Sequence, residues 1–212
     1  MGNTYLFTIE FSNPVGSLQS LNTLKNGVRI SKNVLVLLIE KCPMLTVVNI
    51  DNIDIEITDD IILAFAEKCP RLVELTIQHL SDHYINSNIS DIAIESLVIA
   101  NPQIESLVLD PCTSLTDKSL NCVAQHCHHF RDLVCYGGSA EIMDKSACLF
   151  IESNHRTLRV LDLSCTLITD QTILSLYCCT ELVHVYLMEC SLVTKEQIFE
   201  LQEKIPSLKI EF

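Results

Sequence analysis

One pattern recurs along almost the whole chain and constrains its fold more than any other feature. Most copies carry apolar residues at their first, fourth and sixth places, then a polar turn, then Ser or Thr, usually followed by Asp. The copies begin at Leu18, Leu45, Leu72, Ile104, Phe130, Leu158 and Leu182, and a shortened eighth copy begins at Leu208. A repeat that returns every ~20–30 residues is typical of a solenoid, in which each unit packs only against its neighbours.

Each repeat predicts one strand followed by one helix. In Leu45–Ile50 the fourth and sixth side chains share one face of a short strand, because side chains alternate along a strand. After the turn, apolar residues return at helical spacing, as in Ile61, Ile62 and Phe65. The sequence therefore predicts parallel strands in one sheet, with helices packed against one side of it.

The recurring Ser or Thr marks the predicted start of each helix. Its hydroxyl can accept a hydrogen bond from an unpaired amide of the first turn, and the Asp that follows suits the positive end of the helix dipole. Where the motif breaks, at Met143, we expect Asp144 to take over the cap. Because the carboxylates recur in register, capping explains them better than an acid–base array does.

Cysteine also recurs at fixed places in the repeat. It precedes the strand core by three residues at Cys42, Cys69, Cys127 and Cys179, and it returns in the turn after the strand at Cys112 and Cys190. With the Thr-Asp helix starts, this pattern resembles the cysteine-containing subfamily of leucine-rich repeats, found in F-box/LRR proteins and in the F-box-less antagonist-of-mitotic-exit-network type. Other residues replace the first cysteine at Asn101, His155 and Ile205.

The resemblance covers residues 18–212 and implies the fold class: an α/β, right-handed leucine-rich-repeat solenoid, or horseshoe. Its parallel sheet would line the concave face and its helices the convex face. We expect residues 18–212 to form one domain of about seven repeats plus a terminal strand. Residues 1–17 would form an N-terminal cap, because the apolar Tyr5–Phe11 could cover the open edge of the first repeat.

The resemblance also bears on function. F-box/LRR proteins carry an F-box ahead of the repeats that recruits a ubiquitin-ligase core, and the 16 or so residues before the first repeat here are too few to hold one. The implied function is a non-enzymatic protein–protein interaction module, adaptor or substrate-recognition-like, with ubiquitin-ligase components as candidate partners. A pathogen effector or viral mimic of a host F-box/LRR protein is the close alternative.

Composition restricts the partner and the compartment. The chain has 27 acidic and 14 basic side chains, a net charge of −13, without the basic stripe expected of a nucleic-acid binder. An anionic membrane surface is disfavoured for the same reason, whereas a partner with a basic patch is favoured. The 11 cysteines at repeat positions suit reduced, buried thiols and a cytoplasmic or nuclear protein. We expect a monomer.

Reactive side chains offer an alternative of a different class, a Cys/His-dependent enzyme or metal-binding protein. The densest group, Cys122–His129, lacks the usual zinc spacing, and Cys127 falls at the buried cysteine position. Cys178 or Cys179 could pair with His184 as a nucleophile, but no phosphate loop or nucleophile elbow accompanies them. We therefore predict no enzyme activity, no cofactor and no metal.

The strongest site candidate comes from residues that share a position in successive strands. The position between the last two core residues holds Asn22, Asn49, Thr76, Val108, Val134, Asp162 and Tyr186. Aromatic residues, Met and Arg gather in the C-terminal half, as they do in protein-interface hot spots. The predicted protein-binding residues on the concave face are Arg131, Val134, Tyr136, Arg159, Asp162, His184, Tyr186 and Met188. The long turn Gln78–Asn86 of the third repeat is a second candidate contact region.

Overall fold

Strands and helices alternate along the chain in the computed structural model, which describes residues 7–11, 21–26, 31–51, 57–78, 89–110, 114–135 and 141–212. The strands are β1 (Phe7–Phe11), β2 (Leu21–Asn26), β3 (Val47–Asp51), β4 (Glu74–Gln78), β5 (Ser106–Asp110), β6 (Asp132–Cys135), β7 (Val160–Asp162), β8 (His184–Tyr186) and β9 (Lys209–Glu211). The helices are α1 (Lys32–Lys41), α2 (Asp59–Lys68), α3 (Asp91–Ala100), α4 (Asp117–His126), α5 (Asp144–Asn154), α6 (Asp170–Ser175) and α7 (Lys195–Lys204), and a short 3₁₀ turn, η2 (Leu176–Cys178), extends α6.

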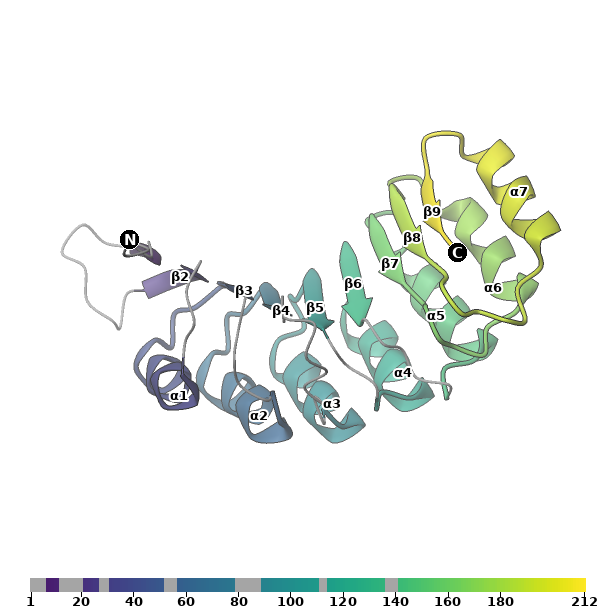
Figure 1. The fold of residues 1–212 in the computed structure, drawn as a ribbon. Helices are drawn as coiled ribbons and strands as arrows, with labels where there is room; N and C mark the ends of the chain where they lie inside the picture. The colour runs from purple at the N-terminus through teal and green to yellow at the C-terminus, as the bar shows by residue number, and fades with distance from the viewer. Residues whose placement is uncertain are drawn as a thin grey trace, which may run out of the picture.

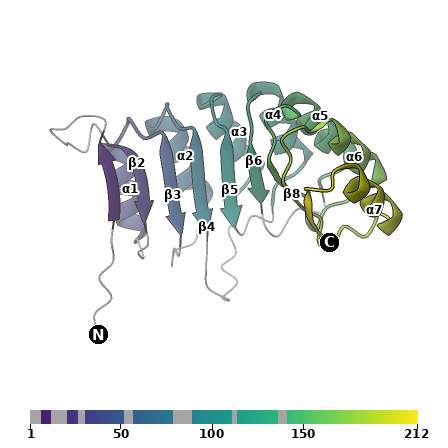
Figure 2. The same ribbon diagram turned by 90° about the horizontal axis from the view of Figure 1, so that it is seen from above.

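The strands form one sheet in sequence order, from β1 to β9. All described neighbours from β2 onward pair in parallel, whereas β1 runs antiparallel to β2. Figure 1 shows the sheet along the inner, concave side of a curved array and the helices along its outer side, and Figure 2 shows the strands side by side. The predicted α/β solenoid, with its sheet concave and its helices convex, is confirmed.

The register explains how the repeats share one core. The fourth places of successive copies, Val48, Leu75, Leu107, Leu133 and Leu161, lie next to one another across the sheet, and all are buried. The predicted apolar helix residues Ile61, Ile62 and Phe65 are fully buried against them. Each unit therefore buries its apolar face only with help from the next unit.

The first repeat begins three residues later than predicted. Leu24 pairs with Val48 and is buried, and Lys25 rather than Asn22 lies beside Asn49. Leu21 and Leu24 have the same spacing as Leu18 and Leu21, so the sequence pattern fits both registers. Pairing with β3 selects the register that buries Leu24. Most of the predicted cap, residues 1–6 and 12–17, lies outside the described residues, so the cap remains a prediction.

The Asp residues at the helix starts act mainly between repeats. Asp91 accepts hydrogen bonds from the backbone N–H (2.9 Å) and hydroxyl (2.7 Å) of Thr116 in the next repeat. The equivalent acceptors and donors are Asp59 with Ser90, Asp117 with the N–H of Met143, Asp144 with Thr169, and Asp170 with Thr194. We call this series of bonds the Asp ladder.

The predicted capping is therefore only partly correct. The hydroxyls of Thr116, Thr169 and Thr194 accept first-turn amides, whereas Ser31, Thr58 and Ser90 make no such bond. The expectation that Asp144 caps its own helix is wrong, because Met143 is the N-cap residue and the Asp144 carboxylate binds Thr169 and Thr172. The next repeat offers this carboxylate three donors.

An asparagine takes the place of the first cysteine in two repeats. The side-chain oxygen of Asn101 accepts the N–H of Leu72 at 3.0 Å, and that of Asn154 accepts the N–H of Phe130 at 2.8 Å. Asn154, rather than the predicted His155, therefore fills this position in its repeat. Counting back from Leu158 missed it because α5 has 11 residues, where α1 to α4 each have 10.

Candidate protein-binding surface

The C-terminal strands place the predicted aromatic residues on the concave face. The register sets Tyr186 between Asp162 on β7 and Glu211 on β9. The ring of His184 stacks on that of Tyr186, with centroids 4.1 Å apart and planes 20° apart. His184 Nε2 lies 3.0 Å from a carboxylate oxygen of Glu211. His184, Tyr186 and Glu211 thus form one connected group, which we call the β8–β9 aromatic site.

Burial and two neighbouring carboxylates keep the Tyr186 hydroxyl protonated. Burial raises the pKa of Tyr186, and the nearby charges of Glu211 and Asp162 raise it further. Sequence reasoning missed Glu211, although the shortened last copy places it in the same column as Tyr186. Extending that column from Leu208 would have pointed to Phe212, whereas the register of the last strand brings Glu211 beside Tyr186.

Asp162 does not lie exposed on the concave face, contrary to the sequence prediction. Its residue is 5% exposed, one carboxylate oxygen accepts the N–H of Ser164 at 2.9 Å, and the other has no hydrogen-bond partner among the described residues. Burial raises its pKa, the hydrogen bonds from Ser164 partly counter this, and the charge of Glu211 adds to the rise. Asp162 is therefore a buried, incompletely satisfied acid directly beside Tyr186.

Arg131 is tied to its own chain. Its guanidinium lies 3.4 Å from Glu74, 3.7 Å from Glu105 and 3.9 Å from Asp132, so it links three neighbouring repeats. Because these three carboxylates offset the positive charge of the guanidinium, Arg131 would attract an acidic group of a partner only weakly. Arg159, one repeat further on, is exposed and makes no ion pair with any described residue.

Of the remaining predicted residues, two are described in the structure and one is not. Val134 and Met188 are half-buried, and the Met188 backbone is fixed by the hydroxyl of Ser164 and the N–H of Cys165. Tyr136 lies outside the described residues, as does most of the predicted contact turn of the third repeat. The structure thus brings His184 and Tyr186 together, with Asp162 buried beside Tyr186.

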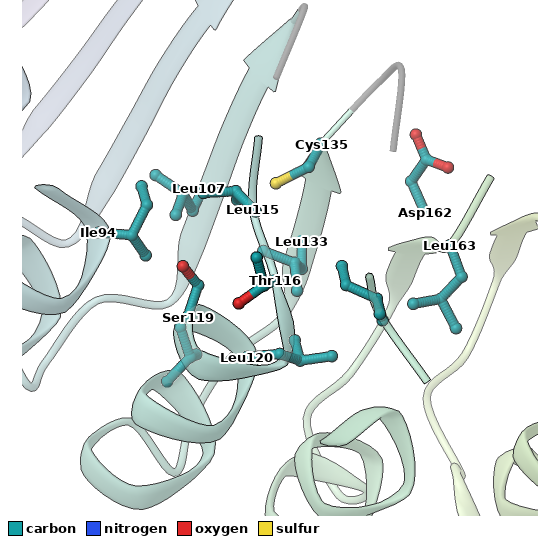
Figure 3. Close-up of a pocket in the computed structure, with 12 residues that line it drawn as sticks. Ile94, Leu107, Leu115, Thr116, Ser119, Leu120, Leu133, Cys135, Asp162 and Leu163 are labelled. Atoms are coloured by element: carbon teal, nitrogen blue, oxygen red, sulfur yellow. The ribbon is translucent and has the colours of Figure 1, made fainter. Parts of the chain in front are cut away.

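A small cavity lies in the core behind β6 (Figure 3). Its volume is about 30 Å³, and its lining is mainly apolar, from the sheet, from α4 and from the turn before α5. Cys135 stands at its edge, in the column where Ile50, Ile77 and Leu109 fill the core. The smaller cysteine side chain leaves this space, so we regard the cavity as a packing gap.

The reactive side chains do not assemble into a catalytic group among the described residues. Cys122 Sγ lies 3.6 Å from His126 Nδ1 on the same helix, and His128 and His129 are exposed. Burial, with a smaller contribution from a neighbouring cysteine in each case, raises the pKa of Cys127 and of Cys179 to about 12. In the described ranges no three His, Cys, Asp or Glu side chains are grouped to hold a metal ion, and no helix is long and apolar enough to cross a membrane.

Comparison with known proteins adds a likeness of shape. The sequence matches no protein-family model and no curated protein. Among solved structures it is similar to a chain of the crystal structure of the Rad7 and Elc1 complex in yeast, at 15% sequence identity and a TM-score of 0.47. The match covers 84% of this chain, which spans 65% of the length of that one. So distant a likeness assigns no function.

Proposed function

We propose that this protein is a non-enzymatic interaction module that binds a protein partner on the concave face of its C-terminal repeats. The stacked His184–Tyr186 pair beside Met188 carries the proposal. Aromatic and Met side chains at the surface are typical of interface hot spots. His184 and Tyr186 lie on β8 and Met188 lies two residues further along, so the sheet would present them to a partner already ordered.

The chemistry supports binding rather than turnover. The pKa values of Cys127 and Cys179, raised to about 12, leave both thiols protonated at neutral pH, whereas a nucleophilic cysteine needs its thiolate. The His184 ring contacts the Tyr186 ring and the Glu211 carboxylate, and these contacts would orient a binding residue equally well. We infer an adaptor or substrate-recognition-like role in the cytoplasm or nucleus, with the protein as a monomer and ubiquitin-ligase components as candidate partners.

The test is capture of partners from cell lysate with three folded forms of the protein. They are the wild type, a concave variant Tyr186→Ala/Met188→Ala, and a convex control Leu174→Ala/Phe199→Ala, whose targets are 51% and 61% exposed. We expect the concave variant to lose a partner that the wild type and the convex control retain. Equal recovery by all three would contradict the concave site, and loss only in the convex control would move the site to the helices.

A further inference from the structure

Two acidic residues lie beside Tyr186: Glu211 of the β8–β9 aromatic site and Asp162 on β7. Neither has a lysine or arginine partner in the part of the chain that the structure describes, and the basic side chain that contacts Glu211 is His184. Asp162 and Glu211 flank Tyr186 on the two neighbouring strands. The closest described cations in sequence, Arg159 and Lys209, form no ion pair with either carboxylate. Lys209 pairs in register with His184, two positions from the Tyr186–Glu211 pair. This surface therefore combines an aromatic ring with two carboxylates that no described lysine or arginine pairs with.

The buried acid points toward the face of the sheet that lines the concave side. In Figure 3 its carboxylate is directed away from the helices, whereas Leu163 is directed toward them. The oxygen without a partner belongs to a residue that is 95% buried, counting from its 5% exposure. An unsatisfied buried acceptor is costly for a folded protein, so its presence beside a candidate binding surface calls for a ligand.

The geometry points to an arginine side chain of the protein partner as the ligand of the β8–β9 aromatic site. This inference rests on the proposed function and specifies the partner's contacting group. The 53% exposed Glu211 side chain would pair with the guanidinium, Tyr186 would contact its planar face, and Asp162 would add negative potential from below. Arginine fits better than lysine because its planar group can stack on a ring and bind a carboxylate at the same time.

His184 has a positioning role in this arrangement. Its stacking on Tyr186 covers one face of that ring, and its contact with Glu211 holds the carboxylate beside the ring. A guanidinium would then approach the remaining face of Tyr186, because the face of an aromatic ring attracts a cation and its edge does not. Both groups that contact the cation are held on adjacent strands, which lowers the loss of side-chain freedom on binding.

The inference is tested with a small probe, N-acetyl-arginine methylamide, titrated into the full chain while the ring signals of Tyr186 are followed by NMR. The matched ligand is N-acetyl-citrulline methylamide, which has a similar shape without the charge. We expect a saturating shift with the arginine probe and almost none with citrulline. Glu211→Gln should weaken binding about three- to fivefold, the upper part of the range for an exposed ion pair.

A charge-matched control separates a site from general attraction to an acidic protein. Glu203→Gln on α7 removes the same charge from an exposed convex position and should leave binding unchanged. Asp162→Asn, which keeps an acceptor for Ser164, should weaken binding as Glu211→Gln does. A shift that does not saturate, equal shifts with citrulline, or equal weakening by Glu203→Gln would overturn the inference.

The probe and the lysate experiment can fail separately. If the concave variant loses its partner but the arginine probe does not bind, the concave face binds its partner by other chemistry and only this inference fails. If the probe binds at Tyr186 but no captured partner depends on that residue, the proposed function fails and the site accepts cations without serving that partner.

Discussion

Asp144 and Thr169 join two neighbouring repeats through both donors of the threonine. The Asp144 carboxylate accepts the Thr169 backbone N–H at 2.8 Å and its hydroxyl at 2.7 Å, and it also accepts the hydroxyl of Thr172 at 2.6 Å. Hydrogen bonds to a charged group are stronger than those between neutral groups. The same type of bond recurs from α2 to α7, so the convex helices are linked at their N-terminal ends as well as through the core.

Removing one step of the Asp ladder should destabilise the whole array. Asp144→Ala leaves two threonine hydroxyls and one amide without their acceptor, and we expect it to lower the free energy of unfolding by about 2–3 kcal/mol. Urea unfolding followed by circular dichroism measures this. Glu152→Ala, an exposed change on the same helix, should stay within about 0.5 kcal/mol. Equal effects of the two changes would mean that the ladder contributes nothing.

The same carboxylate should make stability fall in acid. Burial alone would raise the pKa of Asp144, but the hydrogen bonds from Thr169 and Thr172 outweigh it and lower the pKa from 3.8. The stabilisation is therefore complete above the unfolded pKa near 3.8 and is lost as pH falls through the lower folded value. The stability difference between wild type and Asp144→Ala should shrink below about pH 4. A difference independent of pH would contradict it.

Asp162 should show the opposite dependence. Its pKa in the folded protein is raised above 3.8, first by burial, so its ionisation costs stability as pH rises from acid toward neutral. Asp162→Asn should thus match the wild type near pH 3 and become the more stable of the two as pH rises to 7. Thermal unfolding of both proteins across this range is the measurement. A variant less stable than wild type at pH 7 would show that the ionised carboxylate is needed for folding.

Asn154 and His155 provide an adjacent pair of changes with different expected results. Asn154→Ala removes the buried acceptor for the Phe130 N–H and should cost about 2 kcal/mol of unfolding free energy. His155→Ala alters a partly exposed side chain that contacts only the carbonyl of Glu152 among the described residues, and it should be nearly neutral. Chemical denaturation of the two variants compares these losses directly. A larger loss in His155→Ala than in Asn154→Ala would mean that His155, and not Asn154, occupies the repeat position.

Filling the gap behind β6 should stabilise the protein. At ~24 cal/mol per Å³, removing a cavity of about 30 Å³ corresponds to roughly 0.7 kcal/mol, and Cys135→Leu restores the residue type of this column. We expect a small rise in melting temperature, measured by calorimetry. Leu109→Ala in the same column should lower stability by about 2–5 kcal/mol. A destabilised Cys135→Leu variant would indicate that the space is already closed around cysteine.

The sequence predicts the repeat architecture well because the apolar residues that recur at fixed spacing are the ones that the fold buries in its core. It predicts less where two registers share a spacing, as with Leu21 and Leu24, or where a helix gains one residue, as before Leu158. Burial of Asp162 depends on how neighbouring strands and turns cover it, which a column alignment cannot show. The role of Asp144 escaped prediction because its donors lie 25 and 28 residues away, and local capping rules consider only nearby amides.

In the Asp ladder each carboxylate binds the repeat that follows it in the chain, and this contact is equivalent in all the interior repeats. From α2 to α6 each helix offers a carboxylate to the following unit, whereas α1 and α7 carry Lys32 and Lys195 at the same place. A unit that runs from one such Asp to the residue before the next, such as 91–116, could be duplicated or deleted by recombination without leaving a carboxylate unmatched. The number of interior units could therefore change during evolution or design, and with it the length of the concave face.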